Sequence, residues 1–399
     1  MAIPPKEANE VLGFDYYNIF EANMTDKQRE TRDRVRQWVQ NSVLPNINPY
    51  WEKAEFPFDL FYEMKDLGII GGALTEHGTS GLDFVENGLV AYELAKGDGS
   101  IGTAYGVHSG LALSAIGYLG SEEQKARWMP DMVSMEKIGA FALTEPTVGS
   151  NAAGIKTTAK RDGDHYILNG AKRWIGNASI SNILVVWARD DEGKIGAFVV
   201  EDAIDQDGVS MENIFGKVAK RAVLNAEIHF DNVRVPAENR LDKVRSFRDA
   251  SMVLFNGRYG VSWEAAGCAA GAFEHALKYA MEREQFGKPI AGFQLIQQKL
   301  VEMASEVTAM QAMCMELARN AERGTLTESM SSMAKYHNAR KARRVTQLAR
   351  ETLGGNGIVI DNHIARLWTD AEVIYTYEGT NEVNMLIVGR DITGMNAFV

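Results

Sequence analysis

One carboxylate near the C-terminus has surroundings that suit a strong base. Glu378 follows an apolar aromatic run at 373–375 and precedes a helix that we expect to begin at Asn381. Contact with apolar side chains raises the pKa of a carboxyl, whereas the amide dipoles of a helix N-terminus lower it. This opposition tunes a general base, so we expect Glu378 to remove a proton from carbon. The alternative is an ordinary acidic residue near a helix start.

The bulk composition limits the class of protein. The chain has 399 residues, a net charge of −11, 45% hydrophobic residues and 24% charged residues. This length predicts two or three domains, and the composition is that of a soluble globular protein. The acidic balance argues against a nucleic-acid partner. The basic run 340–344 lies in a helical pattern, which favours a solvated face or a subunit contact over a DNA site.

Cysteines, histidines and the chain ends carry no further signal of function. Cys268 and Cys314 lack CxxC spacing, so we expect them to pack in the core. The seven histidines include no pair at metal-ligand spacing, and we predict no metal. The sequence shows no signal segment, no run of membrane-spanning length and no peroxisomal ending, so we expect a cytoplasmic protein without membrane insertion.

Three textures divide the chain into an N-terminal α-helical domain (1–139), a middle β domain (140–243) and a C-terminal helical bundle (244–399). Residues 25–28 have the form of a capping box, and Pro45 is expected to end the first helix. In the middle, β-rich runs separated by Asp-Gly, Asn-Gly and Glu-Gly turns predict a small antiparallel, barrel-like domain. These runs cover 165–168, 183–188, 197–200 and 226–235.

Long helical patterns return over 247–284, 291–322 and 326–353, followed by two shorter helices. They predict an up-and-down four-helix bundle, so the fold class is α+β. No GxGxxG lies between a strand and a helix, and the P-loop lysine and the GxSxG elbow are absent. The glycines at 354, 355 and 357 close a long helix, which predicts a left-handed turn.

Four separated stretches together resemble the acyl-CoA dehydrogenase family. They are Phe-Ala-Leu-Thr-Glu-Pro at 141–146 with Gly-Ser-Asn at 149–151, Asn-Gly-Ala-Lys-Arg-Trp-Ile-Gly-Asn at 169–177, Arg-Glu-Gln-Phe-Gly at 283–287, and Tyr-Glu-Gly-Thr at 377–380. The resemblance runs from about residue 25 to the C-terminus. Residues 351–357 and 389–394 are most similar to the glutaryl-CoA dehydrogenase branch and to short-chain acyl-CoA oxidases.

The resemblance implies a homotetrameric flavoenzyme with FAD between the β domain and the bundle. Thr144 and Ser150 would bond the flavin and its diphosphate, and Trp174 would stack on the ring unless it is a core residue of the β domain. Backbone of a neighbouring subunit would approach the same cofactor at the glycines near 354. The residues implied to contact FAD are Phe141, Leu143, Thr144, Gly149, Ser150, Trp174, Ile175, Gly176, Arg283, Gln285, Phe286, Gln294, Glu351, Gly354, Gly355, Thr380 and Asn381.

The implied reaction is the α,β-dehydrogenation of an acyl-CoA thioester. Glu378 would take the α-proton, flavin N5 would accept the β-hydride, and the backbone N–H of Glu378 would stabilise the thioester oxygen. Electrons would pass to an electron-transferring flavoprotein; an oxidase that uses O₂, a non-redox elimination and a non-catalytic scaffold stay open as alternatives. The residues implied to contact the substrate are Gly102, Gly106, Ser109, Ser150, Arg258, Tyr377 and Gly379.

The chain departs from its relatives at several positions. Gly102 stands where glutaryl-CoA enzymes carry an arginine, and a nearby family glutamate is Ala95, so we expect an uncharged or differently recognised short acyl group. Gly176 replaces a threonine that lies near the flavin in most dehydrogenases. His108 with Ser109 is oxidase-like and is expected to line the acyl pocket. Asp249 is a second, weaker candidate for the base.

Overall fold

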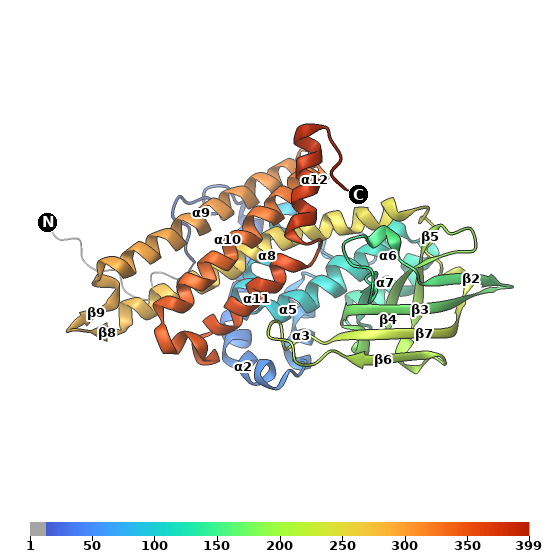
Figure 1. The fold of residues 1–399 in the computed structure, drawn as a ribbon, viewed down its shortest axis with the longest axis horizontal. Coiled ribbons are helices and arrows are strands. Elements are labelled where there is room, and N and C mark those ends of the chain that lie inside the picture. The colour runs from blue at the N-terminus through green and yellow to red at the C-terminus, as the bar shows by residue number, and fades with distance from the viewer. Residues whose placement is uncertain (1–12, 399) are drawn as a thin grey trace.

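The computed structural model describes residues 13–398, and Figure 1 shows the three parts that the sequence predicts. The sheet lies at one end of the molecule, the long C-terminal helices extend to the other, and the N-terminal helices lie between and beneath them. None of the helices within residues 13–398 is long and apolar enough to cross a membrane.

The N-terminal part is helical and includes two π-helical segments. Its elements are α1 (Asp26–Trp38), η2 (Val39–Val43), α2 (Leu44–Lys53), α3 (Phe58–Glu63), η3 (Met64–Leu67), α4 (Phe84–Gly97), α5 (Gly99–Tyr105), η4 (Gly106–Leu113), α6 (Ser114–Leu119) and α7 (Glu122–Val133). The predicted capping box at Thr25 and Gln28 is confirmed. The expectation that Pro45 ends the first helix is wrong, because Pro45 lies in the first turn after η2, where a missing N–H is tolerated.

The middle part is one seven-stranded sheet. Its strands are β1 (Gly139–Ala142), β2 (Thr158–Asp162), β3 (His165–Gly176), β4 (Ile183–Arg189), β5 (Ile195–Glu201), β6 (Val209–Asn213) and β7 (Asn225–Pro236), in the order β1-β4-β2-β3-β7-β6 with β5 paired to β4. The prediction of a purely antiparallel sheet is wrong, because β1 runs parallel to β4 and β2 meets β4 in parallel. These pairings join distant segments, and a turn signal reports only on neighbouring strands.

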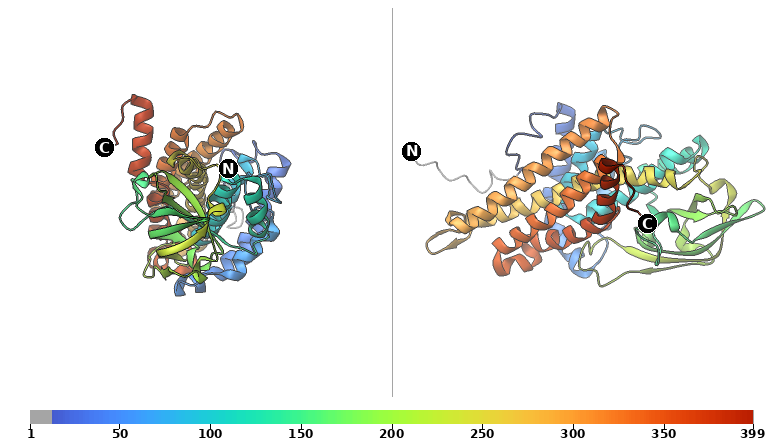
Figure 2. Two further views of the ribbon diagram at one scale, coloured as in Figure 1. Left: turned by 90° about the vertical axis from the view of Figure 1, so that its right-hand side faces the viewer. Right: turned by 45° about the horizontal axis from the view of Figure 1, so that its top comes forward.

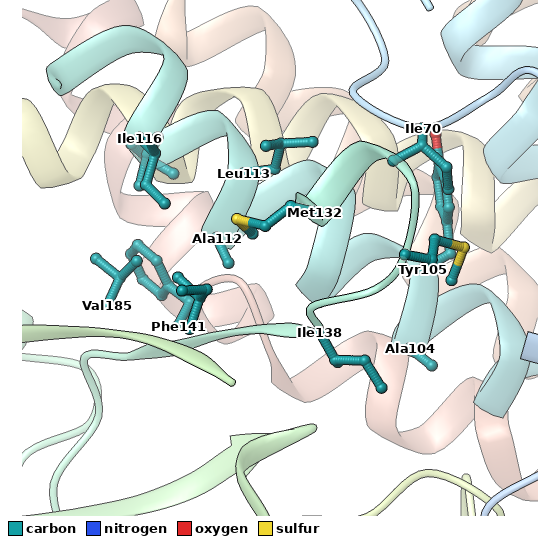
Figure 3. Close-up of a cluster of buried hydrophobic side chains, with 14 of the residues drawn as sticks. Ile70, Ala104, Tyr105, Ala112, Leu113, Ile116, Met132, Ile138, Phe141 and Val185 are labelled. Carbon is teal, nitrogen blue, oxygen red and sulfur yellow. The ribbon is translucent and has the colours of Figure 1, made fainter. Parts of the chain in front are cut away.

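Both faces of the strands β4 and β5 are buried. In β4, Val185 and Trp187 belong to the core shared with the N-terminal helices, whereas Leu184 and Val186 face a second core on the other side. This alternation follows from the two-residue period of a strand. Figure 3 shows Phe141 and Val185 of the sheet near Ala112 and Ile116 of the helices. The β domain is therefore held on the helices that precede it.

The C-terminal part consists of α8 (Phe247–Glu282), α9 (Gln294–Glu322), α10 (Glu328–Thr352), α11 (Ile364–Thr376) and α12 (Asn381–Thr393). A short hairpin of β8 (Glu284–Gln285) and β9 (Lys288–Pro289) joins α8 to α9. Gly354 has φ +57, as the left-handed turn predicts. Helix α8 has 36 residues and is therefore about 54 Å long. It runs from the sheet end to the hairpin end (Figure 1).

Glycines let α4 and α8 approach closely. A Cβ at Gly88 of α4 would lie 2.2 Å from the Trp263 ring, and a Cβ at Gly267 of α8 would lie 2.1 Å from the Tyr92 carbonyl oxygen. A Cβ at Gly271 would meet the Lys96 carbonyl oxygen at 2.4 Å. This contact fixes the N-terminal domain against the bundle, and the candidate site lies between them.

The Gly267→Ala variant tests this close approach. Overpacking against the Tyr92 backbone is expected to lower the free energy of unfolding by about 1–3 kcal/mol, although alanine favours a helix over glycine by about 1 kcal/mol. Thermal unfolding measures the change. The control is Gly389→Ala in α12, where a Cβ meets no atom within 4 Å, and which should be neutral or stabilising. Equal stability of the two variants would contradict the packing described.

Candidate active site

Glu378 lies in a sharp turn between α11 and α12. Its backbone has φ +54, and that of Gly379 has φ +84, so two successive residues are left-handed. A non-glycine residue in this region is uncommon and marks a position that its surroundings must hold. Thr380 then caps α12, since its Oγ1 accepts a hydrogen bond from Val383 N at 3.3 Å. The helix predicted to begin at Asn381 is confirmed.

Buried cations hold this turn through its backbone. The fully buried Lys335 of α10 donates from Nζ to Tyr375 O (2.9 Å), to Gly379 O (3.0 Å) and to Asn381 Oδ1 (3.0 Å). Burial lowers the pKa of Lys335 to about 7. Arg258 of α8, also buried, donates from Nε to Glu378 O at 3.3 Å and pairs with Glu328 at 2.7 Å. Both cations therefore bond oxygens other than the Glu378 carboxylate.

Glu378 is half-buried, and one oxygen of its carboxylate is buried without a partner. Its Oε2 has no hydrogen-bond partner among residues 13–398 and lies against Gly257 of α8, where a Cβ would come within 2.7 Å of it. Burial raises the pKa of Glu378 to about 7, and the Glu264 carboxylate adds to the rise, while Arg258 and Lys335 oppose it. A carboxyl with a pKa near 7 is matched to accepting a proton at neutral pH.

Several glycines of α8 and η4 have open space where a side chain would stand. A Cβ added at Gly260 of α8, at Gly106 or at Gly110 of η4 would meet no heavy atom within 4 Å. A Cβ added at Gly102, one turn before Gly106, would lie 3.7 Å from the Ala95 backbone nitrogen. The predicted substrate residues Gly102 and Gly106 therefore lie on a helix whose partly exposed side carries no large side chain at these positions.

Trp174 lies at the irregular end of β3. Its backbone has φ +65, its side chain is 53% exposed, and the β3–β7 register shifts between Lys172 and Ile175. Arg173 N donates to Thr144 O at 2.9 Å, which brings the predicted Thr144 loop beside the indole. The alternative that Trp174 is a core residue is wrong, because half of its surface is exposed. An exposed indole offers a flat apolar face for a ring.

A buried ion pair shapes the loop that carries Thr144. Glu145 accepts from Thr157 N (2.9 Å), from Thr157 Oγ1 (2.6 Å) and from Lys172 Nζ (2.9 Å). Lys172 also donates to Leu143 O at 2.9 Å, and burial lowers its pKa to about 8. Residues 143–157 are therefore fastened to β3 next to Trp174. Gly149 and Ser150 are exposed on this loop.

Several predicted site residues have structural roles. Phe141, Leu143 and Ile175 bury their side chains, so only their backbone is available to a ligand. The expectation that His108 and Ser109 line the pocket is wrong: the His108 ring lies between Met132 O and Gly139 N, and Ser109 Oγ accepts from Gly71 N.

Three further polar residues of the prediction also bond within the chain. Asn381 is buried and donates to Tyr336 O at 2.9 Å. Asp249 caps α8 by accepting from Ser246 N at 2.9 Å, which removes it as a second base. Glu351 pairs with Lys299 at 3.0 Å.

A second group of predicted cofactor residues lies at the end of the molecule opposite the sheet. Arg283, Gln285 and Phe286 form the β8–β9 hairpin, and Phe286 is 94% exposed with φ +53. Gly354 and Gly355 would each place a Cβ in open space, and Gln294 at the start of α9 is exposed. The hairpin and the sheet lie at opposite ends of the molecule in Figures 1 and 2. Within one chain the two groups therefore cannot contact the same cofactor.

One cluster has the residue types of a metal site. Ligand atoms of Glu76, His77 and Glu122 lie within 4.8 Å of one another. Lys125 pairs with Glu76 at 2.7 Å and with Glu122 at 3.0 Å, so an ammonium already compensates both carboxylates. The cluster therefore gives no support for a bound cation.

Sequence reasoning missed four residues that form this site. Lys335 and Gly257 hold and accommodate Glu378, and Lys220 and Glu264 form an ion pair close to it. An isolated lysine or glutamate inside an apolar stretch of a predicted helix, as at 335 and 264, is a signal of a buried charge that must be paired. The partners themselves come from distant segments and have no local signal.

The chain matches known proteins over nearly its whole length. Residues 25–136, 140–233 and 247–393 match the N-terminal, middle and C-terminal domains of acyl-CoA dehydrogenase. A curated relative is the short-chain specific acyl-CoA dehydrogenase of Clostridium acetobutylicum, 32% identical over 93% of this chain and 99% of that protein.

Two solved structures of Mycobacterium smegmatis glutaryl-CoA dehydrogenase are similar in fold. One has a TM-score of 0.93 and 39% identity, covering 99% of this chain and 100% of that chain. The other is a complex with FADH2, with a TM-score of 0.92 and 34% identity, covering 95% of this chain and 98% of that chain.

The raised pKa of Glu378 has a consequence for stability. Because the folded pKa of about 7 exceeds the ordinary 4.5, the folded protein holds this proton more tightly, and its stability falls as pH rises from about 4.5 to 7. Glu378→Gln should therefore be more stable than the wild type at pH 8 by about 1–3 kcal/mol, with a smaller difference at pH 5. Thermal unfolding at both values measures this.

The control for this prediction is Glu382→Gln in the first turn of α12. The pKa of Glu382 is lowered by hydrogen bonds from its own backbone and from Tyr375. Glu382→Gln should therefore be no more stable than the wild type at either pH 8 or pH 5. A Glu378→Gln variant that behaved like this control would contradict the raised pKa of the Glu378 carboxyl.

Proposed function

The chain belongs to the acyl-CoA dehydrogenase family, and from this premise we propose that it dehydrogenates a short-chain acyl-CoA thioester with Glu378 as the base. Membership makes the protein an FAD-dependent oxidoreductase that acts on CH–CH groups. The observation that carries the choice of base is the buried, unpaired Oε2 of Glu378, which lies against Gly257 one turn before the open position at Gly260.

Glu378 is suited to two tasks in this reaction. Its carboxylate would take the proton from the α-carbon, which balances the departure of the β-hydrogen as hydride. Its backbone N–H makes no hydrogen bond to another group of residues 13–398, so it is free to donate to the thioester oxygen as negative charge develops there.

FAD supplies the hydride acceptor when it is bound. The Trp174 indole and the Thr144 loop would hold its ring half, because they present an exposed apolar face and backbone groups side by side. Arg283, Gln285 and Phe286 would hold the ADP half, where a guanidinium can pair with phosphate. Since these groups lie at opposite ends of one chain, we propose that a second copy completes each cofactor site, in a homotetramer.

The acyl group is proposed to be short and uncharged at its end. The position of the glutarate-binding arginine is Gly102, and that of the nearby glutamate is Ala95, so neither member of that charge pair is available here. A second carboxylate would then have no arginine to compensate its burial. Similarity to a relative named as short-chain specific supports the same conclusion.

The proposed electron acceptor is an electron-transferring flavoprotein. The curated and solved relatives described above carry the name dehydrogenase, which supports a carrier protein over O₂. Gly176, where most dehydrogenases have threonine, lies against Val107: a Cβ there would come within 3.0 Å of its side chain. The absence of a side chain at Gly176 avoids this close contact with η4. This packing role explains the glycine without a reaction with O₂.

An anaerobic mixing experiment tests the assignment of the base. Glu378→Gln should retain bound FAD and lose bleaching of the flavin by a four-carbon acyl-CoA by at least 1000-fold, because the amide cannot take the α-proton. The matched control is Asp249→Asn, the other carboxylate considered, which should bleach at close to the wild-type rate. Equal loss in both variants, or none in Glu378→Gln, would refute the base. Admission of air then shows whether peroxide forms without a carrier.

The rate of flavin reduction should depend on pH through Glu378. Only the ionised carboxylate accepts the proton, and burial raises the pKa of Glu378 to about 7. The second-order rate constant of flavin reduction, measured in single-turnover mixing, should therefore rise about tenfold per pH unit below 7 and level off above it. A rate that is constant from pH 5.5 to 8.5 would show that another step or group limits proton removal.

A further inference from the structure

Lys220 brings one buried ammonium into contact with all three domains. It lies in the loop between β6 and β7, and its Nζ donates to Thr103 of α5, to Glu264 of α8 and to the Tyr377 hydroxyl. The Tyr377 hydroxyl in turn donates to Glu264 Oε2 at 2.6 Å. The side chains of Lys220 and Glu264 are 4% and 11% exposed. Tyr377 directly precedes the base.

This ion pair is internally satisfied. The three N–H donors of the ammonium are all used, each Glu264 oxygen accepts one hydrogen bond, and the two charges cancel. Displacing either partner would leave the other as an uncompensated buried charge, which is strongly unfavourable. The Lys220 and Glu264 side chains are therefore held in place, and they form what is called the wall below.

The loop does not need this ammonium to stay in place. Lys220 N donates to Asp370 Oδ1, and Ala222 N donates to Ser100 Oγ at 3.2 Å. Arg221 donates to Trp51 O at 3.0 Å, and Lys217 Nζ donates to Lys220 O at 3.0 Å. Since several other bonds hold the backbone, the position of the Lys220 side chain calls for a separate explanation.

The pair closes one end of the space beside the base. On α8, Gly257 faces the Glu378 carboxylate, Gly260 faces open space, and Glu264 lies two turns beyond Gly257, about 10 Å along the helix. Beyond Gly260, all residues of α8 as far as 274 are buried, so the accessible side of the helix ends here. On the facing helix, Thr103 lies one turn from Gly106, which also faces open space.

We propose that Lys220 and Glu264, with Thr103 and Tyr377, form the closed end of the acyl compartment and set the maximum length of the acyl group. This inference rests on the proposed function and adds to it a pair of specificity-determining residues. An α-carbon level with Gly257 leaves about 10 Å to Glu264, less one contact distance of about 4 Å. The remaining distance of about 6 Å spans roughly four to five C–C bonds beyond the α-carbon, so the compartment takes acyl groups of up to roughly six or seven carbons.

Two double variants test the wall without leaving an unpaired charge. Lys220→Ala with Glu264→Ala removes the wall, and Lys220→Met with Glu264→Gln removes the charges but keeps the volume. The measurement is kcat/KM for anaerobic flavin reduction by four-, six- and eight-carbon saturated acyl-CoA thioesters. Ratios between thioesters at one pH cancel any change in the basicity of Glu378, and a purely structural role would not change them.

The wild type should prefer the four-carbon over the eight-carbon thioester by at least 100-fold. The Ala/Ala variant should raise the eight-to-four-carbon ratio by at least tenfold, since each methylene is worth roughly 10–200-fold in an apolar pocket. The Met/Gln variant should keep the wild-type ratio within a few-fold.

Three outcomes would overturn the inference. They are equal use of four- and eight-carbon thioesters by the wild type, an unchanged ratio in a folded, flavin-bound Ala/Ala variant, and the same large rise in the Met/Gln variant. If the Ala/Ala variant does not fold, the relative use of four-, six- and eight-carbon thioesters by the wild type decides whether the inference stands. Absence of bleaching by every thioester would instead defeat the proposed function, and this inference with it.

Discussion

The constraint on which the rest of the structure depends is a half-buried carboxylate, that of Glu378, with one buried oxygen kept without a partner. An unsatisfied buried acceptor costs about 1–3 kcal/mol, and a direct ion pair would remove that cost while lowering the pKa. Lys335 and Arg258 lie close enough to favour ionisation of Glu378, yet their hydrogen bonds go to backbone oxygens and to other side chains. The turn is thereby held firmly while its carboxylate remains free to take a proton.

The surrounding fold preserves this arrangement. Helix α8 supplies Gly257 beside the carboxylate and, farther along, the glycines that let α4 approach, so one helix sets both the base and the position of the N-terminal domain. The sheet is fixed to the same N-terminal helices through β1 and β4, and Gly176 at the end of β3 lies against Val107 of η4.

The sequence predicted the features that have local signals. The α12 start, the capping box at Thr25, the long helices and four of the strands all follow from spacing and turn residues. Four separated motifs taken together led to the family. Contacts between distant segments were not predictable: β1 pairs in parallel with β4, and Lys220 meets Tyr377 across 157 residues of chain. Ser109 was placed in the pocket by its resemblance to oxidases, which gives no sign of the distant Gly71 N that its Oγ accepts from.

The separation of Glu378 from the Phe286 hairpin has a genetic consequence. If a second copy completes each cofactor site, as proposed, a chain with a damaged turn still offers a sound hairpin, and a chain with a damaged hairpin still offers a sound turn. Co-expression of two such defective alleles would restore some working centres in mixed assemblies. Mutations at these two places would therefore complement each other, whereas two mutations in the same turn or in the same hairpin would not.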